Sequence, residues 1–171
     1  MIPPVLETER LILRAPLLRD LDPYAGFLQS ERSHIVGGPM DRTDAFRSLS
    51  ALAGHWALRG FGRWALELKT GGDCLGFVGL HYPESWPEPE IGWTVFDGAE
   101  GKGYAHEAAV AARAYAYGVA GWPTAMSLIA ADNPRSQALA RRLGAVYERD
   151  FLHPKYGPLG VWRHPGPESL A

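Results

Sequence analysis

Cysteine is nearly absent from this chain, since Cys74 is the only one among 171 residues. A disulfide within the chain and a zinc site built from cysteines are therefore excluded, and we expect no metal centre. Long hydrophobic runs are also missing: no stretch approaches the roughly 20 apolar residues of a membrane-spanning helix. The first residues show neither a charged leader nor an apolar segment of signal-peptide length. We therefore expect a cytoplasmic protein with no membrane partner.

Neither positive nor negative charge is in large excess. The 17 Lys and Arg residues stand against 19 Asp and Glu residues, which gives a formal net charge of -2. Such a chain has no basic field for a phosphate backbone, so we expect no nucleic-acid partner. Hydrophobic residues make up 46% of the sequence, in the range of folded globular domains. Because no repeat, low-complexity block or linker interrupts the sequence, we expect one domain over residues 1–171.

Hydrophobic periodicity predicts a mixed α and β order of elements. In the first half, two helices interrupt a series of strands, with a loop at 34–39 between the helices and a hairpin turn at 70–73. In the second half, strands and helices alternate, and Gly144 ends the last helix in the left-handed conformation. The expected strands are 10–15, 63–69, 75–82, 90–96, 126–131, 145–151 and 159–163, and the expected helices are 20–30, Thr43 or Asp44 to about Arg59, 103–119 and 133–143.

A glycine-rich turn between an expected strand and an expected helix is the most informative segment. A helix start presents unpaired N–H groups and the positive end of its dipole, and Gly101 and Gly103 let an anion approach the backbone. Together these features fit a pyrophosphate. The turn lacks the third glycine of the dinucleotide fingerprint, and Gly103 follows Lys102 where a Walker loop needs Ser or Thr. A tight strand–helix connection would explain the turn alone equally well.

A second segment, Asp132 to Ala145, opens the last expected helix. Asn133 is a good N-cap, Pro134 suits the first helical position, and Ser136 falls in the first turn. A well-formed helix without a special role would show the same pattern.

The two segments in this order resemble the GNAT superfamily of N-acetyltransferases. Glu100-Gly101-Lys102-Gly103-Tyr104-Ala105 matches the last positions of its Gln/Arg-x-x-Gly-x-Gly/Ala turn, and Asn133 to Ala145 matches its Asn-x-x-Ser helix with Leu-Gly-Ala. The opening Glu7-Thr8-Glu9-Arg10-Leu11-Ile12-Leu13-Arg14 and the strand Glu90-Ile91-Gly92-Trp93 look like the RimJ/RimL-like branch, named for ribosomal-protein N-terminal acetyltransferases. The resemblance covers residues 7 to 165. It departs at Glu100, where the family has Gln or Arg, so we expect that carboxylate to point to solvent.

The resemblance implies an α+β fold, with a central mixed, mostly antiparallel sheet flanked by about four helices. It also implies acetyl-CoA as cofactor and direct attack of a primary amine on the thioester within a ternary complex. The acceptor, a small molecule or a protein N-terminus, is left open by the sequence, and so is the choice between monomer and homodimer. The implied cofactor-binding residues are Trp93, Thr94, Val95, Gly101, Lys102, Gly103, Tyr104, Ala105, Asn133 and Ser136.

Catalytic roles are also carried over by position. Glu90 begins the strand that leads to the cofactor turn and is the candidate general base, with Glu67 and His81 as rivals on neighbouring strands. Ser136 is the candidate proton donor to the leaving thiolate. A main-chain N–H between Trp93 and Val95 would stabilise the carbonyl oxygen, and Gly92 is compatible with a β-bulge there.

Two other functions are compatible with parts of the sequence. A non-catalytic acyl-CoA-binding regulatory module would be expected to lack both Glu90 and Ser136, and this chain has both. A nucleotide-binding regulator is disfavoured because both nucleotide motifs fail.

Overall fold

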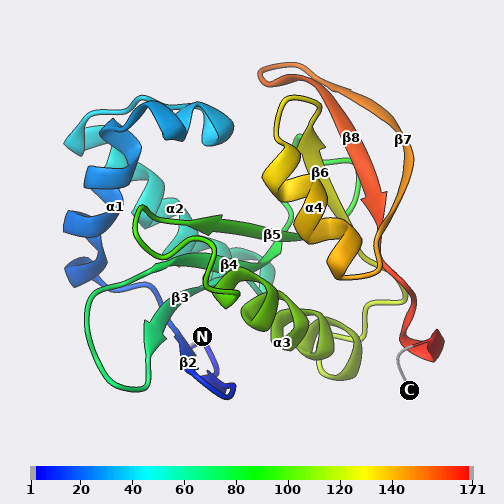
Figure 1. The fold of residues 1–171 in the computed structure, drawn as a ribbon, viewed down its shortest axis with the longest axis horizontal. Helices are drawn as coiled ribbons and strands as arrows, with labels where there is room; N and C mark the ends of the chain where they lie inside the picture. Colours follow the sequence, from blue (N-terminus) through cyan, green and yellow to red (C-terminus); the bar gives the residue numbers. More distant parts are fainter. Residues whose placement is uncertain (1–2, 170–171) are drawn as a thin grey trace.

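The computed structural model describes residues 3–169, which contain one eight-stranded sheet in the order β1-β2-β3-β4-β5-β6-β8-β7 (Figure 1). Neighbouring strands are antiparallel except β5 and β6, which are parallel. The mixed, mostly antiparallel sheet is therefore confirmed. The strands are β1 (Leu6–Glu7), β2 (Leu11–Arg14), β3 (Arg63–Leu68), β4 (Gly76–His81), β5 (Glu90–Val95), β6 (Met126–Ala130), β7 (Val146–His153) and β8 (Gly157–Arg163).

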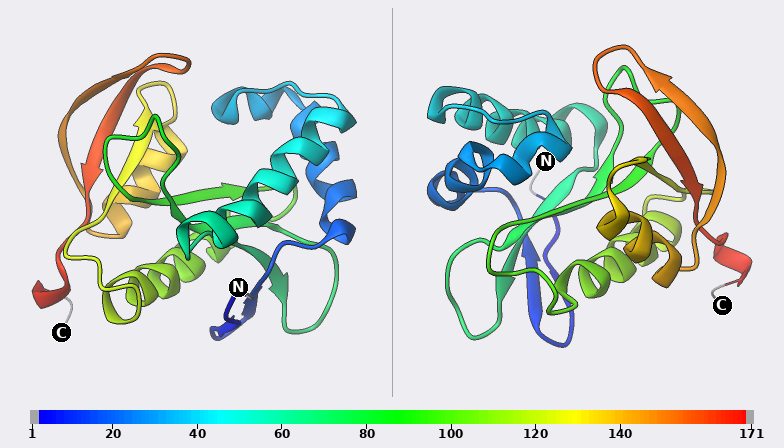
Figure 2. Two further views of the ribbon diagram at one scale, coloured as in Figure 1. Left: turned by 180° about the vertical axis from the view of Figure 1, so that it is seen from behind. Right: turned by 45° about the horizontal axis from the view of Figure 1, so that its top comes forward.

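Residues 3–169 also contain four α-helices, which lie around the sheet, and three short 3₁₀ helices. Figures 1 and 2 show α2 crossing one face of the sheet and α3 crossing the other, while α4 lies beside β6 and β8. The helices are α1 (Leu21–Gln29), α2 (Arg42–Arg59), α3 (Tyr104–Gly118) and α4 (Pro134–Arg142), and the 3₁₀ helices are η1 (Leu18–Asp20), η2 (Glu31–Val36) and η3 (Pro167–Ser169).

Each face of the sheet has its own hydrophobic core. One core contains α3, which packs through a fully buried stripe of alanines at helical spacing against large side chains of β2 to β5. The other core lies under α1 and α2 and is rich in phenylalanine. Small side chains let the α3 backbone approach the sheet closely, so the start of α3 is held at a fixed place relative to β5. The alanine stripe consists of Ala108, Ala109, Ala112 and Ala116.

The local structure differs from the sequence-based expectations at three places. The N-cap of α2 is Asp41, whose carboxylate accepts a hydrogen bond from Asp44 N at 2.9 Å, and neither Thr43 nor Asp44 is the cap. Residues 34–36 belong to η2, which ends at Gly37 with a left-handed φ of 90°. The two-residue strand β1 was not expected, because such a strand is too short to show a period.

No helix within residues 3–169 is both long enough and apolar enough to cross a membrane.

Candidate active site

The site is organised around a gap in the sheet between β5 and β6. These two strands pair at one position, Glu90 with Met126, and then run apart (Figure 1). The next connections between them use side chains. Glu90 Oε2 accepts a hydrogen bond from Leu128 N at 3.2 Å, and Ser127 Oγ donates to Ile91 O at 2.6 Å. Two of the main-chain groups that lose their partners as the strands part, Leu128 N and Ile91 O, are therefore satisfied by side chains.

Ser127 is held by a buried chain of polar groups. Arg113 Nη1 donates to Leu143 O at 2.6 Å and lies 3.2 Å from His164 Nδ1, while His164 Nε2 lies 2.9 Å from Ser127 Oγ. Since arginine can only donate, Nδ1 of His164 accepts and Nε2 carries the hydrogen that is donated to Ser127 Oγ. The Ser127 hydroxyl in turn donates its hydrogen bond to Ile91 O. Burial, together with the charge of Arg113, lowers the pKa of His164 to about 3, so the imidazole is neutral.

Glu90 is a buried carboxylate rather than a surface residue at a strand end. It is 4% exposed, and it accepts hydrogen bonds from Arg63 Nη2 at 2.9 Å on Oε1 and from Trp86 Nε1 at 2.6 Å on Oε2. Burial raises its pKa against the opposing effect of the Arg63 charge. An ionised carboxylate has about four acceptor positions, so with Leu128 N three are used and one on Oε1 is left.

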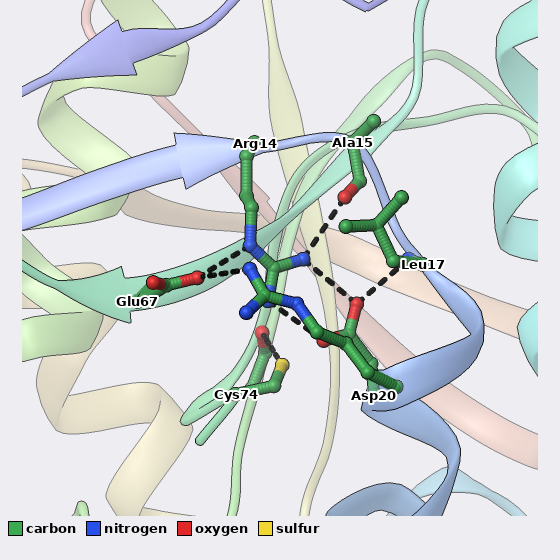
Figure 3. Close-up of polar contacts among 8 residues, drawn as sticks. Arg14, Ala15, Leu17, Asp20, Glu67 and Cys74 are labelled. Atoms are coloured by element: carbon green, nitrogen blue, oxygen red, sulfur yellow. Dashed lines mark hydrogen bonds and ion pairs between the residues drawn. The ribbon is translucent and has the colours of Figure 1, made fainter. Parts of the chain in front are cut away.

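The rival bases occupy different surroundings. Glu67 accepts hydrogen bonds from Arg14 at 2.6 Å and from Arg19 at 2.8 Å, and Figure 3 shows it within the polar cluster that includes Asp20, beside β2 and η1. His81 is on β4 next to Glu90, and burial followed by the charge of Arg63 lowers its pKa to about 2. Cys74, near the same cluster, is buried and its pKa is raised to about 12, so it stays a thiol.

The main chain of β5 presents alternate residues to the gap. Phe96 N donates to Leu75 O on the β4 side, so the alternation of an antiparallel ladder turns Val95 and Trp93 toward β6. The bond between Ile91 O and Ser127 agrees with this alternation. The main chain of Thr94 therefore belongs to the ladder with β4.

Gly92, although compatible with a β-bulge, does not form one toward β4, because β4 and β5 pair in unbroken register from Val95 to Glu90. A different constraint applies to this glycine. A Cβ at Gly92 would overlap Arg63 Nη2 and lie 2.5 Å from Glu90 Oε1. The absence of a side chain makes room for the Arg63–Glu90 ion pair.

The glycine-rich turn presents a run of free main-chain donors. Within residues 3–169, no protein acceptor is found for the main-chain N–H groups of residues 100–106. Gly101 and Gly103 have left-handed φ angles of 70° and 82°, and no side chain of the described residues caps the start of α3. Successive N–H groups in such a conformation form an anion-binding concavity at the positive end of the helix.

Glu100 does not simply point to solvent, contrary to expectation. It pairs with Arg32 of η2 at 2.7 Å and with Arg135 of α4 at 2.9 Å, and Arg32 also pairs with Asp97. The carboxylate that departs from the family pattern is thus neutralised by two guanidinium groups. The two guanidinium groups thereby connect the glycine-rich turn to η2 and to α4.

The start of α4 places Ser136 beside β5. Asn133 acts as the N-cap, with Oδ1 accepting from Ser136 N at 3.1 Å. Trp93 Nε1 donates to Ser136 Oγ at 3.1 Å. The described residues offer no acceptor for the hydroxyl hydrogen of Ser136, and an indole N–H is only a donor. Ser136 is therefore set as a hydrogen-bond donor.

The structure brings together the predicted residues of the turn, of β5 and of α4, and it adds three that the sequence did not indicate. Ser127, His164 and Arg113 come from β6, the segment after β8 and α3. They form one chain of contacts across 51 positions of sequence. Because these residues are far apart in the sequence, no local pattern indicates that they contact one another.

Comparison with known proteins agrees with this arrangement. A family model described as an acetyltransferase (GNAT) domain matches residues 10–146. An acetyltransferase from Agrobacterium tumefaciens str. C58 is 34% identical, with a TM-score of 0.87 over 96% of this chain and 96% of that one. Two more distant structures share the fold. RimL, a ribosomal L7/L12 alpha-N-protein acetyltransferase, is 13% identical, with a TM-score of 0.77 over 94% and 93% of the two chains.

The ribosomal-protein-S5-alanine acetyltransferase from Vibrio fischeri is 14% identical, with a TM-score of 0.73 over 97% of this chain and 98% of that one. With the family model matching most of the chain and a structure above 30% identity along nearly its whole length, the chain belongs to the GNAT family of acetyltransferases.

Proposed function

We propose that this protein transfers an acetyl group from acetyl-CoA to a primary amine, with both substrates bound together. The observation that carries the proposal is the run of main-chain N–H groups at 100–106 without a protein acceptor, at the start of α3. Such a run suits the diphosphate of coenzyme A, because the donors and the helix dipole both favour negative charge.

The residues around the gap fit the rest of that cofactor. Gly101, Lys102, Gly103, Tyr104 and Ala105 would hold the diphosphate through their main chain. Trp93 and Val95 would offer their gap-facing N–H groups to the part of the cofactor that carries the acetyl group. From α4, the side-chain amide of Asn133 would bind the same arm, since its Oδ1 is used in the helix cap and its nitrogen remains a donor.

Acetyl-CoA would supply a thioester whose carbonyl carbon an amine can attack. An α-amino group has a pKa of about 8, so about a tenth is neutral at pH 7, whereas a lysine amine has a pKa of about 10.4. Glu90 would accept the proton of the amine, directly or through a water, at the free acceptor position of Oε1. The raised pKa of this carboxylate makes it a stronger base than an exposed glutamate.

The negative charge that develops on the carbonyl oxygen would be stabilised by the N–H groups of Trp93 or Val95. Ser136 would give its proton to the departing thiolate. The hydrogen bond from Trp93 supports this role, because it occupies an acceptor position of the hydroxyl and leaves the hydrogen free to be donated.

We propose a protein N-terminus as the acceptor, in keeping with a RimJ/RimL-like branch. The support is the fold shared with RimL and with the ribosomal-protein-S5-alanine acetyltransferase, together with the sequence motifs quoted above. A protein N-terminus is also the amine that needs least help from a base at neutral pH.

Calorimetry and a thiol-release assay test the proposal together. Coenzyme A should bind the purified protein, and free thiol should appear when acetyl-CoA is mixed with peptides bearing a free α-amine. The same peptides with a blocked N-terminus and an internal lysine should release thiol far more slowly. Binding without thiol release from any amine would favour a non-catalytic module, and absence of binding would refute the assignment.

A further inference from the structure

The turn between β1 and β2 is attached to the first turn of α3, 99 positions away in sequence. Glu107 is the point of attachment. Its Oε1 accepts hydrogen bonds from Thr8 Oγ1 at 2.6 Å and from Arg10 N at 2.8 Å, and its Oε2 accepts from Arg10 Nε at 2.7 Å. Although partial burial alone would raise it, these bonds lower the pKa of Glu107, so the carboxylate is charged.

Arg10 reaches past Glu107 to the glycine-rich turn itself. Its Nη1 donates to Lys102 O at 2.9 Å, and its guanidinium lies 4.7 Å from the centre of the Tyr104 ring. One planar side chain therefore contacts the Lys102 carbonyl, the ring of Tyr104 at the start of α3, and the carboxylate of Glu107. A guanidinium can do this because its donors diverge in a fixed plane.

The contact with Lys102 O fixes the direction of the neighbouring N–H. The peptide bond between Lys102 and Gly103 is trans, and a trans peptide points its C=O and N–H to opposite sides. With the carbonyl held by Arg10, the N–H of Gly103 is turned away from Arg10. Gly103 lies in the middle of the run 100–106 and has a left-handed φ of 82°, so an unheld peptide at this place could rotate readily.

We propose that Arg10 is a positioning residue for cofactor binding: by holding the Lys102 carbonyl against Glu107, it orients the N–H of Gly103 and its neighbours toward the diphosphate of coenzyme A. This inference rests on the proposed function. It gives a physical role to Thr8 and Arg10, which belong to the opening segment that resembles the RimJ/RimL-like branch.

Direct attraction of phosphate by Arg10 is the competing role. Arg10 borders an open groove of about 460 Å³, which it shares with Gly103 and Arg142. Its charge, however, is already paired with Glu107. The two roles differ in what lysine can replace. A lysine keeps the positive charge but cannot bond Glu107 and the Lys102 carbonyl in one plane.

The experiment compares Arg10→Gln and Arg10→Lys with the wild type. Binding of coenzyme A is measured by calorimetry, and binding of pantetheine, which lacks the diphosphate, by titration followed in ¹⁵N NMR spectra. Arg42→Gln is the matched control, since Arg42 is an exposed arginine paired with Asp22 on the far helices. Melting temperatures establish that each variant is folded.

Both Arg10 variants should bind coenzyme A about tenfold more weakly, the cost of disordering one or two hydrogen-bond donors, with pantetheine affinity unchanged. In the spectra, the Gly103 amide should shift on addition of coenzyme A to the wild type and shift less in the variants. Full affinity in Arg10→Lys would overturn the positioning role in favour of charge alone.

Equal losses for coenzyme A and pantetheine would also overturn the inference, because they would report a general disturbance of the gap. Glu107→Gln provides a second test through the partner residue. Unchanged coenzyme A affinity in this variant would argue against the positioning role of Arg10. A wild type that binds no coenzyme A would instead refute the proposed function, and this inference with it.

Discussion

Gly92 shows how a single missing side chain shapes the site. The Arg63–Glu90 ion pair lies where the Cβ of any other residue would project. Both charged groups are largely buried, with side chains 15% and 5% exposed, so each compensates the charge of the other. Loss of one partner from a buried pair leaves an uncompensated charge, which is far more costly than loss of an exposed pair.

Gly92→Ala should lower the free energy of unfolding by about 1–3 kcal/mol, because the methyl group must displace the ion pair in a packed environment. Gly54→Ala is the control. Gly54 is inside α2 with no atom within 4 Å of an added Cβ, and alanine there should raise stability by about 0.5–1 kcal/mol. Urea unfolding measures both, and a neutral Gly92→Ala would contradict the packing argument.

Trp93 and Ser136 should act as a unit in turnover. We expect Ser136→Ala to lower kcat about tenfold with little change in affinity for coenzyme A, since a thiolate with a pKa of about 8.5 needs only modest help in leaving. Trp93→Phe keeps an aromatic ring but removes the N–H donor to Ser136, so it should also lower kcat. Steady-state kinetics of both single variants and the double variant check this.

The two losses should not add, because the indole acts through the hydroxyl. Tyr147→Phe is the matched control, since its hydroxyl bonds Asp150 on the exposed face of β7 and should leave kcat unchanged. Additive losses would separate the two residues, and an unchanged kcat in Ser136→Ala would remove that residue from the mechanism.

At the scale of elements, the parting of β5 and β6 is stabilised rather than loose. Two parallel strands that separate leave main-chain donors and acceptors without partners, which is costly away from water. Here Glu90 takes one N–H of β6 and Ser127 satisfies one C=O of β5. The gap is thus a built feature of the free protein, and it need not be opened by a ligand.

Ser127→Ala should lower stability by about 1–3 kcal/mol, because Ile91 O and His164 Nε2 both lose a buried partner. Ser50→Ala removes a hydroxyl from the exposed face of α2 and should change stability by less than about 0.5 kcal/mol. Chemical denaturation gives both values. Equal effects of the two substitutions would show that the serine does not support the gap.

At the scale of the whole molecule, buried histidines tie stability to pH. His164 has a pKa of about 3 in the folded state, well below its ordinary value of about 6.5. As the pH falls below 6.5, His164 is protonated in the unfolded chain but stays neutral in the folded protein, so the free energy of unfolding decreases. The stabilisation from this group is complete above pH 6.5 and is lost progressively toward pH 3.

His164→Gln should make the free energy of unfolding less dependent on pH between 6.5 and 5, by up to about 1.4 kcal/mol per pH unit. Glutamine stays neutral and can still accept from Arg113 and donate to Ser127. The variant should be less stable than the wild type at pH 7, since its geometry differs. Urea titrations at several pH values measure the slopes, and parallel slopes would mean that His164 is not the group concerned.

Much of the fold was accessible from sequence because it depends on local chemistry. Of the eight strands and four α-helices within residues 3–169, periodicity predicts seven strands and all four helices. Asn133, Pro134 and Gly144 mark the ends of α4 by rules that act within a few residues. The turn at Gly101 and Gly103 was found for the same reason. The 3₁₀ helix η2, the cap at Asp41 and the short β1 were missed, since their signals are weak or absent.

Local signals specify the order of elements, the glycine-rich turn at the start of α3 and the family resemblance, because each follows from neighbouring residues. Packing between distant segments, by contrast, buries Glu90 among Arg63, Trp86 and Leu128, places Ser136 against Trp93 and brings Arg10 into contact with the turn. These contacts join residues from distant parts of the chain. Their partners, burial and pKa shifts exist only once the sheet has brought them together.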